Sequence, residues 1–143
     1  MSVALPASTA ITILVWRKTD GLDYKKSRHT GLLLRKNQEI QGGLVHATNT
    51  DGPFRVEADY GYNPLTSNSL AGAAQVGVIN KHVDVVMAIV QHTPVRNDLD
   101  EWNCQNWVGD ALQRLVGFGW ITAEQRMDGI DGMADLLAQA PDG

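Results

Sequence analysis

The 143-residue sequence contains a single cysteine, so it cannot form an internal disulfide or rely on an oxidised framework. It also lacks a long apolar run: Ile11 to Trp16 is far shorter than the roughly 18 residues that a membrane-spanning helix requires. No basic segment with a following apolar segment marks a secretory signal near residue 1. We therefore expect a soluble, cytoplasmic protein without an integral membrane segment.

An excess of positive charge is missing as well. The formal net charge is -4, which argues against nucleic acid as a partner because phosphate binding needs clustered cations. The sequence has no glycine-rich phosphate loop, and one cysteine with scattered histidines does not provide the close ligand pairs of a zinc site. We expect no metal and no cofactor. Seven of the 12 basic residues nevertheless lie close together, which predicts a solvated face or an anion-friendly patch: Arg17, Lys18, Lys25, Lys26, Arg28, Arg35 and Lys36.

The length and composition of the chain, with an apolar share of 43% and a charged share of 20%, predict one compact domain over residues 1–143. β-branched or alternating apolar segments predict strands at 11–16, 29–35, 43–49, 54–59 and 75–79. Polar and turn-forming residues predict loops at Asp20-Gly21, Lys36 to Glu39, Asp51 to Pro53 and Gly61 to Gly72.

The second half of the chain has helical spacing. Apolar residues between Val83 and Val90 recur every three or four positions, and Pro94 follows them. A longer apolar stripe begins at Cys104, with Asn103 as a good N-cap residue and Gly117 as a stop. A last, glycine-interrupted helix carries Met133 and Leu137. Strands first and helices later predict an α+β fold in which an antiparallel sheet of four to five strands packs against helices.

Cys104 therefore lies at a helix N-terminus, where unpaired N–H groups and the helix dipole lower the pKa of a thiol. The thiolate is the nucleophilic form, so this position suits covalent catalysis. A lone cysteine on an apolar helix face is also common core packing. The position alone leaves both interpretations open.

Two histidines on consecutive strands supply the other half of the pattern. If Gly31 lies opposite His46 in an antiparallel pair, then His29 and His46 share one face as diagonal neighbours, with Cβ atoms roughly 7–8 Å apart. One ring would then act as a general base and the other would orient it. A register shift of one residue would place the rings on opposite faces. His82 and His92 match no part of this pattern and are expected at the surface.

The segment Asn103-Cys104-Gln105-Asn106-Trp107-Val108 resembles the motif of circularly permuted papain-like enzymes of the NlpC-type superfamily. The segment from Arg28 to Leu34 is similar to the PPPDE isopeptidases. Leu44-Val45-His46-Ala47 looks more like the lecithin:retinol acyltransferase family, which carries a second histidine on the following strand. The resemblance covers separate pieces of the chain, and it implies a single permuted papain-like domain.

Carried over by position, the resemblance implies Cys104 as nucleophile, His29 as general base and His46 as the residue that orients it. Gln105 and Asn103 match motif positions as possible oxyanion or motif support, and Asn103 also serves as a cap. Trp102, next to the nucleophile, is a candidate for the wall of a substrate cleft, with core packing as the alternative.

These residues predict a cysteine hydrolase that cleaves an amide, isopeptide or activated ester of a peptide or acyl substrate through an acyl-thioenzyme. One alternative is an acyltransferase or cyclase that uses the same acyl-enzyme in a biosynthetic pathway. A second alternative is a catalytically inactive binding module of the same fold. The substrate and the oligomeric state do not follow from the sequence.

Overall fold

The computed structural model of the chain describes residues 7–19, 21–36, 39–50 and 52–141. Three of the predicted loops include residues outside these ranges: the loop at Asp20, the connection from Lys36 to Glu39, and the turn at Asp51.

Five strands form one antiparallel sheet: β1 (Thr9–Trp16), β2 (His29–Lys36), β3 (Gly42–Thr48), β4 (Arg55–Tyr62) and β5 (Leu70–Ile79). The strand order is β4-β3-β2-β1-β5, so β1, β2 and β3 lie inside the sheet and β4 and β5 form its edges. Two short 3-10 helices, η1 (Lys25–Ser27) and η2 (Pro64–Thr66), precede β2 and β5. The central strands are the most apolar segments of the sequence, as expected for strands covered on both faces.

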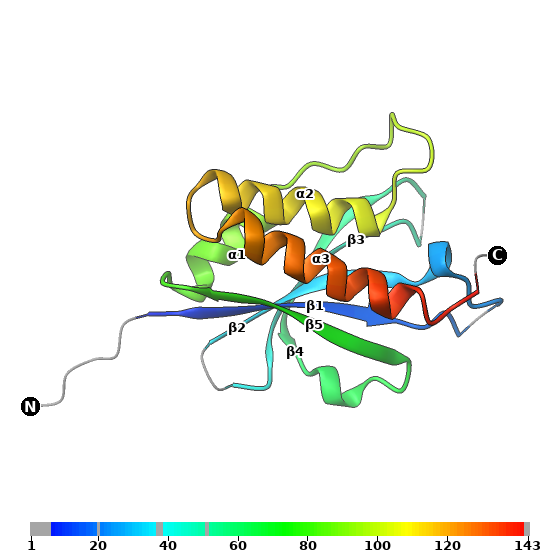
Figure 1. The fold of residues 1–143 in the computed structure, drawn as a ribbon, viewed down its shortest axis with the longest axis horizontal. Helices are drawn as coiled ribbons and strands as arrows, with labels where there is room; N and C mark the ends of the chain where they lie inside the picture. Colours follow the sequence, from blue (N-terminus) through cyan, green and yellow to red (C-terminus); the bar gives the residue numbers. More distant parts are fainter. Residues whose placement is uncertain (1–6, 20, 37–38, 51, 142–143) are drawn as a thin grey trace, which may run out of the picture.

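Three helices complete the chain: α1 (Val83–Gln91), α2 (Cys104–Gly117) and α3 (Ala123–Leu137). They pack on the same face of the sheet, with α2 and α3 side by side (Figure 1). Side chains cap each N-terminus, from His82 on α1, Asn103 on α2 and Thr122 on α3. The predicted α+β class, with an antiparallel sheet against helices and the cysteine at a helix start, is confirmed.

The sheet has a different apolar cluster on each face. Ile11, Ile13 and Val15 of β1 face the helices, together with Leu32 and Leu34 of β2. The alternate residues of the same strands face away from the helices, where a second, smaller buried cluster contains Leu14, Trp16, Leu33 and Leu44. Alternate residues of one strand therefore enter different clusters, one beneath the helices and one on the opposite face of the sheet.

The loop predicted from Gly61 to Gly72 is confirmed for residues 63–69, but both of its ends belong to strands. β4 continues to Tyr62, and β5 begins at Leu70 rather than Gln75. The glycines and alanines at these strand ends are too small to give a clear alternation of apolar and polar residues. Gly72 is one example: a Cβ there would overlap Leu136 of α3, so the strand needs a glycine where the helix approaches.

The last helix is continuous over Ala123–Leu137 rather than broken by its glycines. A Cβ at Gly129 would lie 2.8 Å from a methyl of Val76, and one at Gly132 would lie 2.9 Å from Cβ of Ala74. These glycines let α3 approach β5 closely, which compensates for their poor helix propensity.

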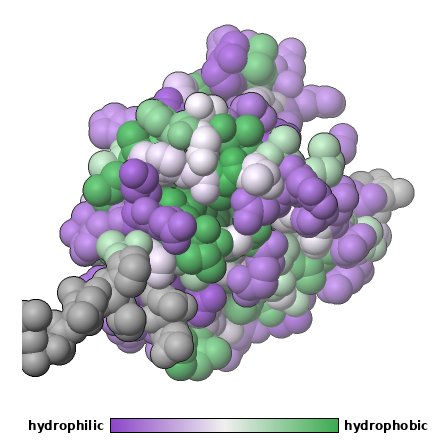
Figure 2. Space-filling model, turned by 60° about the vertical axis from the view of Figure 1, so that its left-hand side comes forward, coloured by the Kyte–Doolittle hydropathy of each residue, from purple (hydrophilic) through white to green (hydrophobic). Residues whose placement is uncertain are grey.

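The end of the molecule that lies at the left in Figure 1 carries hydrophobic side chains interrupted by hydrophilic ones (Figure 2). Within the described residues, no helix combines the length and the apolar character needed to cross a membrane.

Candidate functional site

His29 and His46 meet on the face of the sheet that lies away from the helices. The β2–β3 register pairs Leu32 with Val45, and its continuation by one residue places Gly31 opposite His46. A Cβ on Gly31 would lie only 3.0 Å from Cβ of His46, so the glycine leaves the room that the ring needs. His29 Nε2 and His46 Nδ1 are 2.7 Å apart, with the ring planes at 81°. Of the two registers that the sequence left open, the structure therefore has the one in which the two rings share a face.

Trp16 holds the other side of the His29 ring. The two residues are direct partners in the β1–β2 register, and their rings stack with centroids 5.3 Å apart. The indole Nε1–H of Trp16 donates a hydrogen bond of 3.2 Å to the hydroxyl oxygen of Tyr62. His29 is therefore fixed by an aromatic face and by a ring nitrogen, from two different strands.

The neighbours of His46 determine which nitrogen of His29 can accept a proton. Glu57 lies directly opposite His46 in the β3–β4 register, with its Oε2 atom 3.9 Å from His46 Nε2. A carboxylate favours the tautomer with the proton on that nitrogen. His46 Nδ1 then accepts from His29 Nε2–H, and we assign the lone pair of His29 to Nδ1. The series Glu57, His46, His29 thus orients one basic nitrogen.

Both rings are held in the neutral form near pH 7. Burial, followed by the nearby His46, lowers the pKa of His29 from 6.5 to about 4. The pKa of His46 is lowered by burial, although Glu57 and Asp59 act in the opposite direction. A neutral pair of imidazoles can donate and accept hydrogen bonds without repelling either sign of charge.

A cavity of about 430 Å³ opens beside this pair, and we call it the histidine cavity. It is lined by one indole, two cations, two imidazoles, one amide and several hydroxyl groups: Trp16, Arg17, Lys18, Thr19, Ser27, His29, His46, Thr48, Asn49, Thr50 and Ser69. No carboxylate is found among these described lining residues. Glu57 reaches His46 from β4 and is not part of the lining.

Cys104 lies in a different environment, at the start of α2. Asn103 caps the helix by accepting from the N–H of Gln105, and Asn106 completes a capping box. The Cys104 sulfur packs against the strand start, 3.9 Å from the carbonyl oxygen of Arg28. Only 7% of the residue is exposed. Its hydrogen-bond acceptor is this backbone carbonyl and not an imidazole.

The pKa of the Cys104 thiol is raised above its usual value, which corrects the prediction of a lowered pKa. Burial has the largest effect, and it outweighs hydrogen bonds from Thr30 and from the backbone of Cys104 and Gln105 that act to lower the pKa. The helix start acts to lower the pKa of the thiol, as predicted. The exclusion of water around the sulfur raises this pKa by more.

The structure does not bring Cys104 and His29 together. Cys104 packs with the helix-side cluster and contacts Thr30, whereas the ring of His29 stacks on Trp16 in the cluster on the opposite face. Adjacent residues of a strand point to opposite faces, so residues 29 and 30 cannot both face the sulfur. Among the described residues no hydrogen bond joins the sulfur to either ring. The predicted nucleophile–base contact is absent from this geometry.

The supporting residues of the predicted site have structural partners. The Gln105 side chain donates to the carbonyl oxygens of Lys25, at 2.9 Å, and Arg28, at 3.2 Å, which ties α2 to the segment before β2. Trp102 packs edge-to-face on Phe54 and donates to Asp110, and it does not line the histidine cavity.

Sequence reasoning missed Trp16 and Glu57 as partners of the two histidines. Their contribution follows from strand order, because each reaches a histidine from the strand paired beside it. Period-two patterns show which residues share a face of one strand, but they do not show which strands pair. Groups of three or more His, Cys, Asp or Glu that could hold a metal ion are absent from the described part of the chain.

Comparison with known proteins gives one family match. Residues 19–122, well over half of the chain, match a family described as a family of unknown function, DUF6540. The match includes both histidines, Cys104 and α2. No curated protein and no solved structure matches the chain.

Proposed function

The chain belongs to the DUF6540 family, whose function is unknown, and from its own residues we propose that it is a binding module for a small anionic ligand. The observation that carries this proposal is the histidine cavity, in which a neutral imidazole pair and two cations surround a space without a described carboxylate. The cavity volume of 430 Å³ lies within the range of about 300–1,000 Å³ typical of small-molecule sites.

The charge distribution supports an anion as the ligand. The whole chain has a formal net charge of -4, so a cavity whose described charged residues, Arg17 and Lys18, are both cations differs from the average surface. Hydroxyl groups such as those of Thr48 and Ser69 add donors for carboxylate or phosphate oxygens. The neutral histidine rings add polar walls to the cavity without the desolvation penalty of a further charge.

Ordered side chains around the cavity favour binding, because little entropy is lost when the ligand arrives. The His29 ring is held between Trp16 and His46. Thr48 and Thr50 hydrogen-bond to each other at 2.9 Å at the cavity wall. The two histidines and Thr48 lie on strands, which hold polar groups more precisely than loops do.

Calorimetric titration with inorganic phosphate and with acetate, at constant ionic strength, tests this proposal. We expect binding of at least one anion that weakens at least tenfold in Lys18→Gln and in His29→Asn. Lys81→Gln is the matched control, because it removes a cation that lies over the Trp120 ring and outside the cavity. No binding of either anion, or equal weakening in Lys18→Gln and Lys81→Gln, refutes the proposal.

The second candidate is the cysteine hydrolase suggested by the resemblance to permuted papain-like enzymes, with acyl transfer or cyclisation as its variants. One observation favours it: Cys104 occupies the capped N-terminus of α2, where backbone groups act to lower the thiol pKa, although burial raises it by more. In this mechanism Cys104 attacks the carbonyl of an amide or ester and forms a thioester, while His29 takes the thiol proton and passes it to the amine or alcohol that leaves. Water or another nucleophile then releases the acyl group, and His46 orients His29 throughout. It requires a rearrangement that brings the sulfur and the His29 ring to one side of β2.

Intact-mass analysis after incubation with an acyl thioester, a peptide amide and a ubiquitin-like probe separates the two candidates. An acyl adduct present in the wild type and absent in Cys104→Ala supports the enzyme, with turnover abolished in His29→Ala and only weakened in His46→Ala. We expect no adduct if the chain is the proposed binding module.

A further inference from the structure

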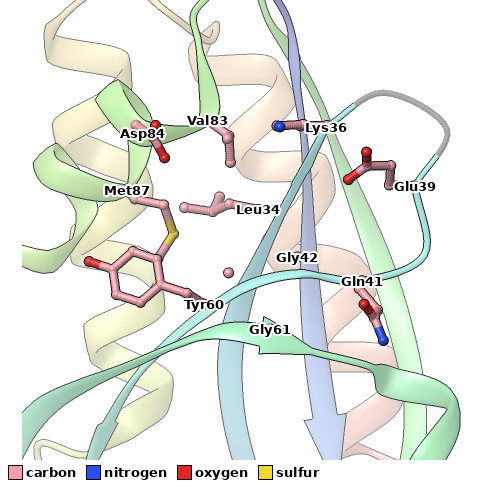
Figure 3. Close-up of a pocket in the computed structure, with 11 residues that line it drawn as sticks. Leu34, Lys36, Glu39, Gln41, Gly42, Tyr60, Gly61, Val83, Asp84 and Met87 are labelled. Atoms are coloured by element: carbon pink, nitrogen blue, oxygen red, sulfur yellow. The ribbon is translucent and has the colours of Figure 1, made fainter.

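A second pocket, of about 330 Å³, lies at the other end of β2 and β3 from the histidine pair, between α1 and the end of β4 (Figure 3). We call it the α1 pocket. Its lining shares no residue with the histidine cavity. Its volume falls at the lower end of the range for small-molecule sites, about 300–1,000 Å³.

The floor of the α1 pocket is apolar and rigid. Leu34 and Met87 are almost completely buried, and Val83 adds a half-buried wall from the first turn of α1. The Met87 sulfur lies where a side chain at residue 43 would be, so Gly43 is needed for α1 to approach β3 this closely. The glycine therefore sets the depth of the pocket floor.

A β-bulge forms the side of the pocket at β4. The β3–β4 register pairs Gly42 with Tyr62 but Leu44 with Asp59, so Gly43 faces two residues, Tyr60 and Gly61. Such bulges interrupt the ladder and redirect side chains, and they are frequent beside binding sites. Gly42, Gly43, Tyr60 and Gly61 all line the pocket, so the opened ladder is part of its wall.

Tyr60 is an exposed aromatic side chain that is held in position. It is 66% exposed, yet its hydroxyl oxygen accepts a hydrogen bond of 2.7 Å from the Gln91 side chain at the end of α1. The ring lies beside the Met87 sulfur at the mouth of the pocket (Figure 3). A fixed, exposed aromatic ring at the mouth of an apolar pocket is typical of recognition surfaces.

Charges of both signs surround the apolar floor. The Lys36 ammonium group and the Asp84 carboxylate extend toward the same space from opposite sides, and Glu39 lies next to Lys36 (Figure 3). His82, the N-cap of α1, accepts the N–H of Asp84 at Nδ1, and this nitrogen is 3.5 Å from Asp84 Oδ2. Among the described residues, no lysine or arginine forms an ion pair with Asp84.

From this arrangement we propose that the α1 pocket binds a small zwitterion with an apolar side chain, of the chemical class of a free aliphatic α-amino acid. The ligand's carboxylate pairs with Lys36, and its ammonium group pairs with Asp84. Its side chain lies against Val83 and beneath Tyr60, the accessible apolar groups of the pocket, above the buried floor of Leu34 and Met87. Each part of the ligand then meets a group of complementary chemistry.

Two-dimensional ¹H–¹⁵N NMR titration with L-leucine tests this inference, with residues 83–87 and 42–43 as the reporters. Two analogues of leucine each lack one of its charged groups: 4-methylpentanoate lacks the ammonium group, and leucinamide lacks the carboxylate. We expect saturable shifts with leucine, and binding at least tenfold weaker for either analogue.

Variants then assign the charges. Asp84→Asn is expected to weaken leucine binding at least fivefold and leave 4-methylpentanoate unchanged, while Lys36→Gln weakens leucine and leaves leucinamide unchanged. Asp128→Asn, an exposed carboxylate on α3, is the control. Both target residues are exposed, so loss of folding is not expected. No saturable shift at the pocket, or equal effects of Asp84→Asn and Asp128→Asn, overturns the inference.

Discussion

Acidification should destabilise the folded chain through His29, because folding lowers the pKa of this residue. The folded-state pKa is about 4, against an ordinary value of 6.5, since burial and the neighbouring His46 disfavour the charged ring. The unfolded chain therefore takes up a proton at this residue first as the pH falls. The stability that depends on neutral His29 is fully present above pH 6.5 and is lost as the pH falls through 4.

The size of the effect follows from the difference in pKa. A shift from 6.5 to about 4, at about 1.4 kcal/mol for each unit, corresponds to a loss of about 3 kcal/mol. This is a substantial part of the 5–15 kcal/mol that roughly bounds the free energy of unfolding of a domain. His46, whose pKa is lowered by burial as well, contributes in the same direction.

Urea unfolding at pH 7, 6, 5 and 4 measures this effect in the wild type and in His29→Asn. Titrating carboxylates contribute to the pH dependence of both proteins, so the difference between their slopes isolates the imidazole. His92→Asn, a substitution of an exposed histidine, is the control. Identical slopes in the wild type and His29→Asn, with an NMR pKa of His29 near 6.5, would show that the ring is not buried as described.

Three substitutions test the surrounding structure by urea unfolding. Gly31→Val should destabilise the fold by about 1–3 kcal/mol, because its Cβ meets Cβ of His46 at 3.0 Å, and an unchanged stability would place the His46 ring elsewhere. Trp107→Phe removes a fully buried indole N–H that donates to the carbonyl oxygen of Thr93 at 3.1 Å. The free energy of unfolding should fall by about 2–4 kcal/mol, and a decrease of less than about 0.5 kcal/mol would contradict this hydrogen bond. Asn103→Ala should remove about 0.5–2 kcal/mol through loss of the α2 cap, whereas no change would exclude the capping role.

Much of the fold is predictable from the sequence, because period-two and period-three-to-four patterns report burial directly. The start of α2 at Cys104 follows from one cap residue and one apolar stripe. The diagonal contact of His29 and His46 follows from the sequence in one of the two registers that the sequence allows, the one that places Gly31 opposite His46. Both signals are local, within one helix or one pair of adjacent strands.

The failed part of the prediction depends on which face of the sheet the helices cover. The sequence shows that Cys104 lies on the apolar face of its helix and that His29 begins a strand. It does not show whether the residues in phase with position 29 or those in phase with position 30 point toward that helix. In the structure Thr30 does, so the sulfur meets a hydroxyl and backbone groups instead of an imidazole. A shift of one residue along β2 would exchange the two arrangements, because alternate residues of a strand point to opposite faces of the sheet.

The rate of Cys104 alkylation by iodoacetamide between pH 6 and 10, in the wild type and in His29→Asn, tests this separation most directly. With the thiol buried and its pKa raised above 9.0, we predict slow labelling that accelerates only above pH 9, with the same profile in both proteins. Rapid labelling below pH 8 in the wild type that His29→Asn abolishes would contradict the separation, because it would require His29 to deprotonate the sulfur.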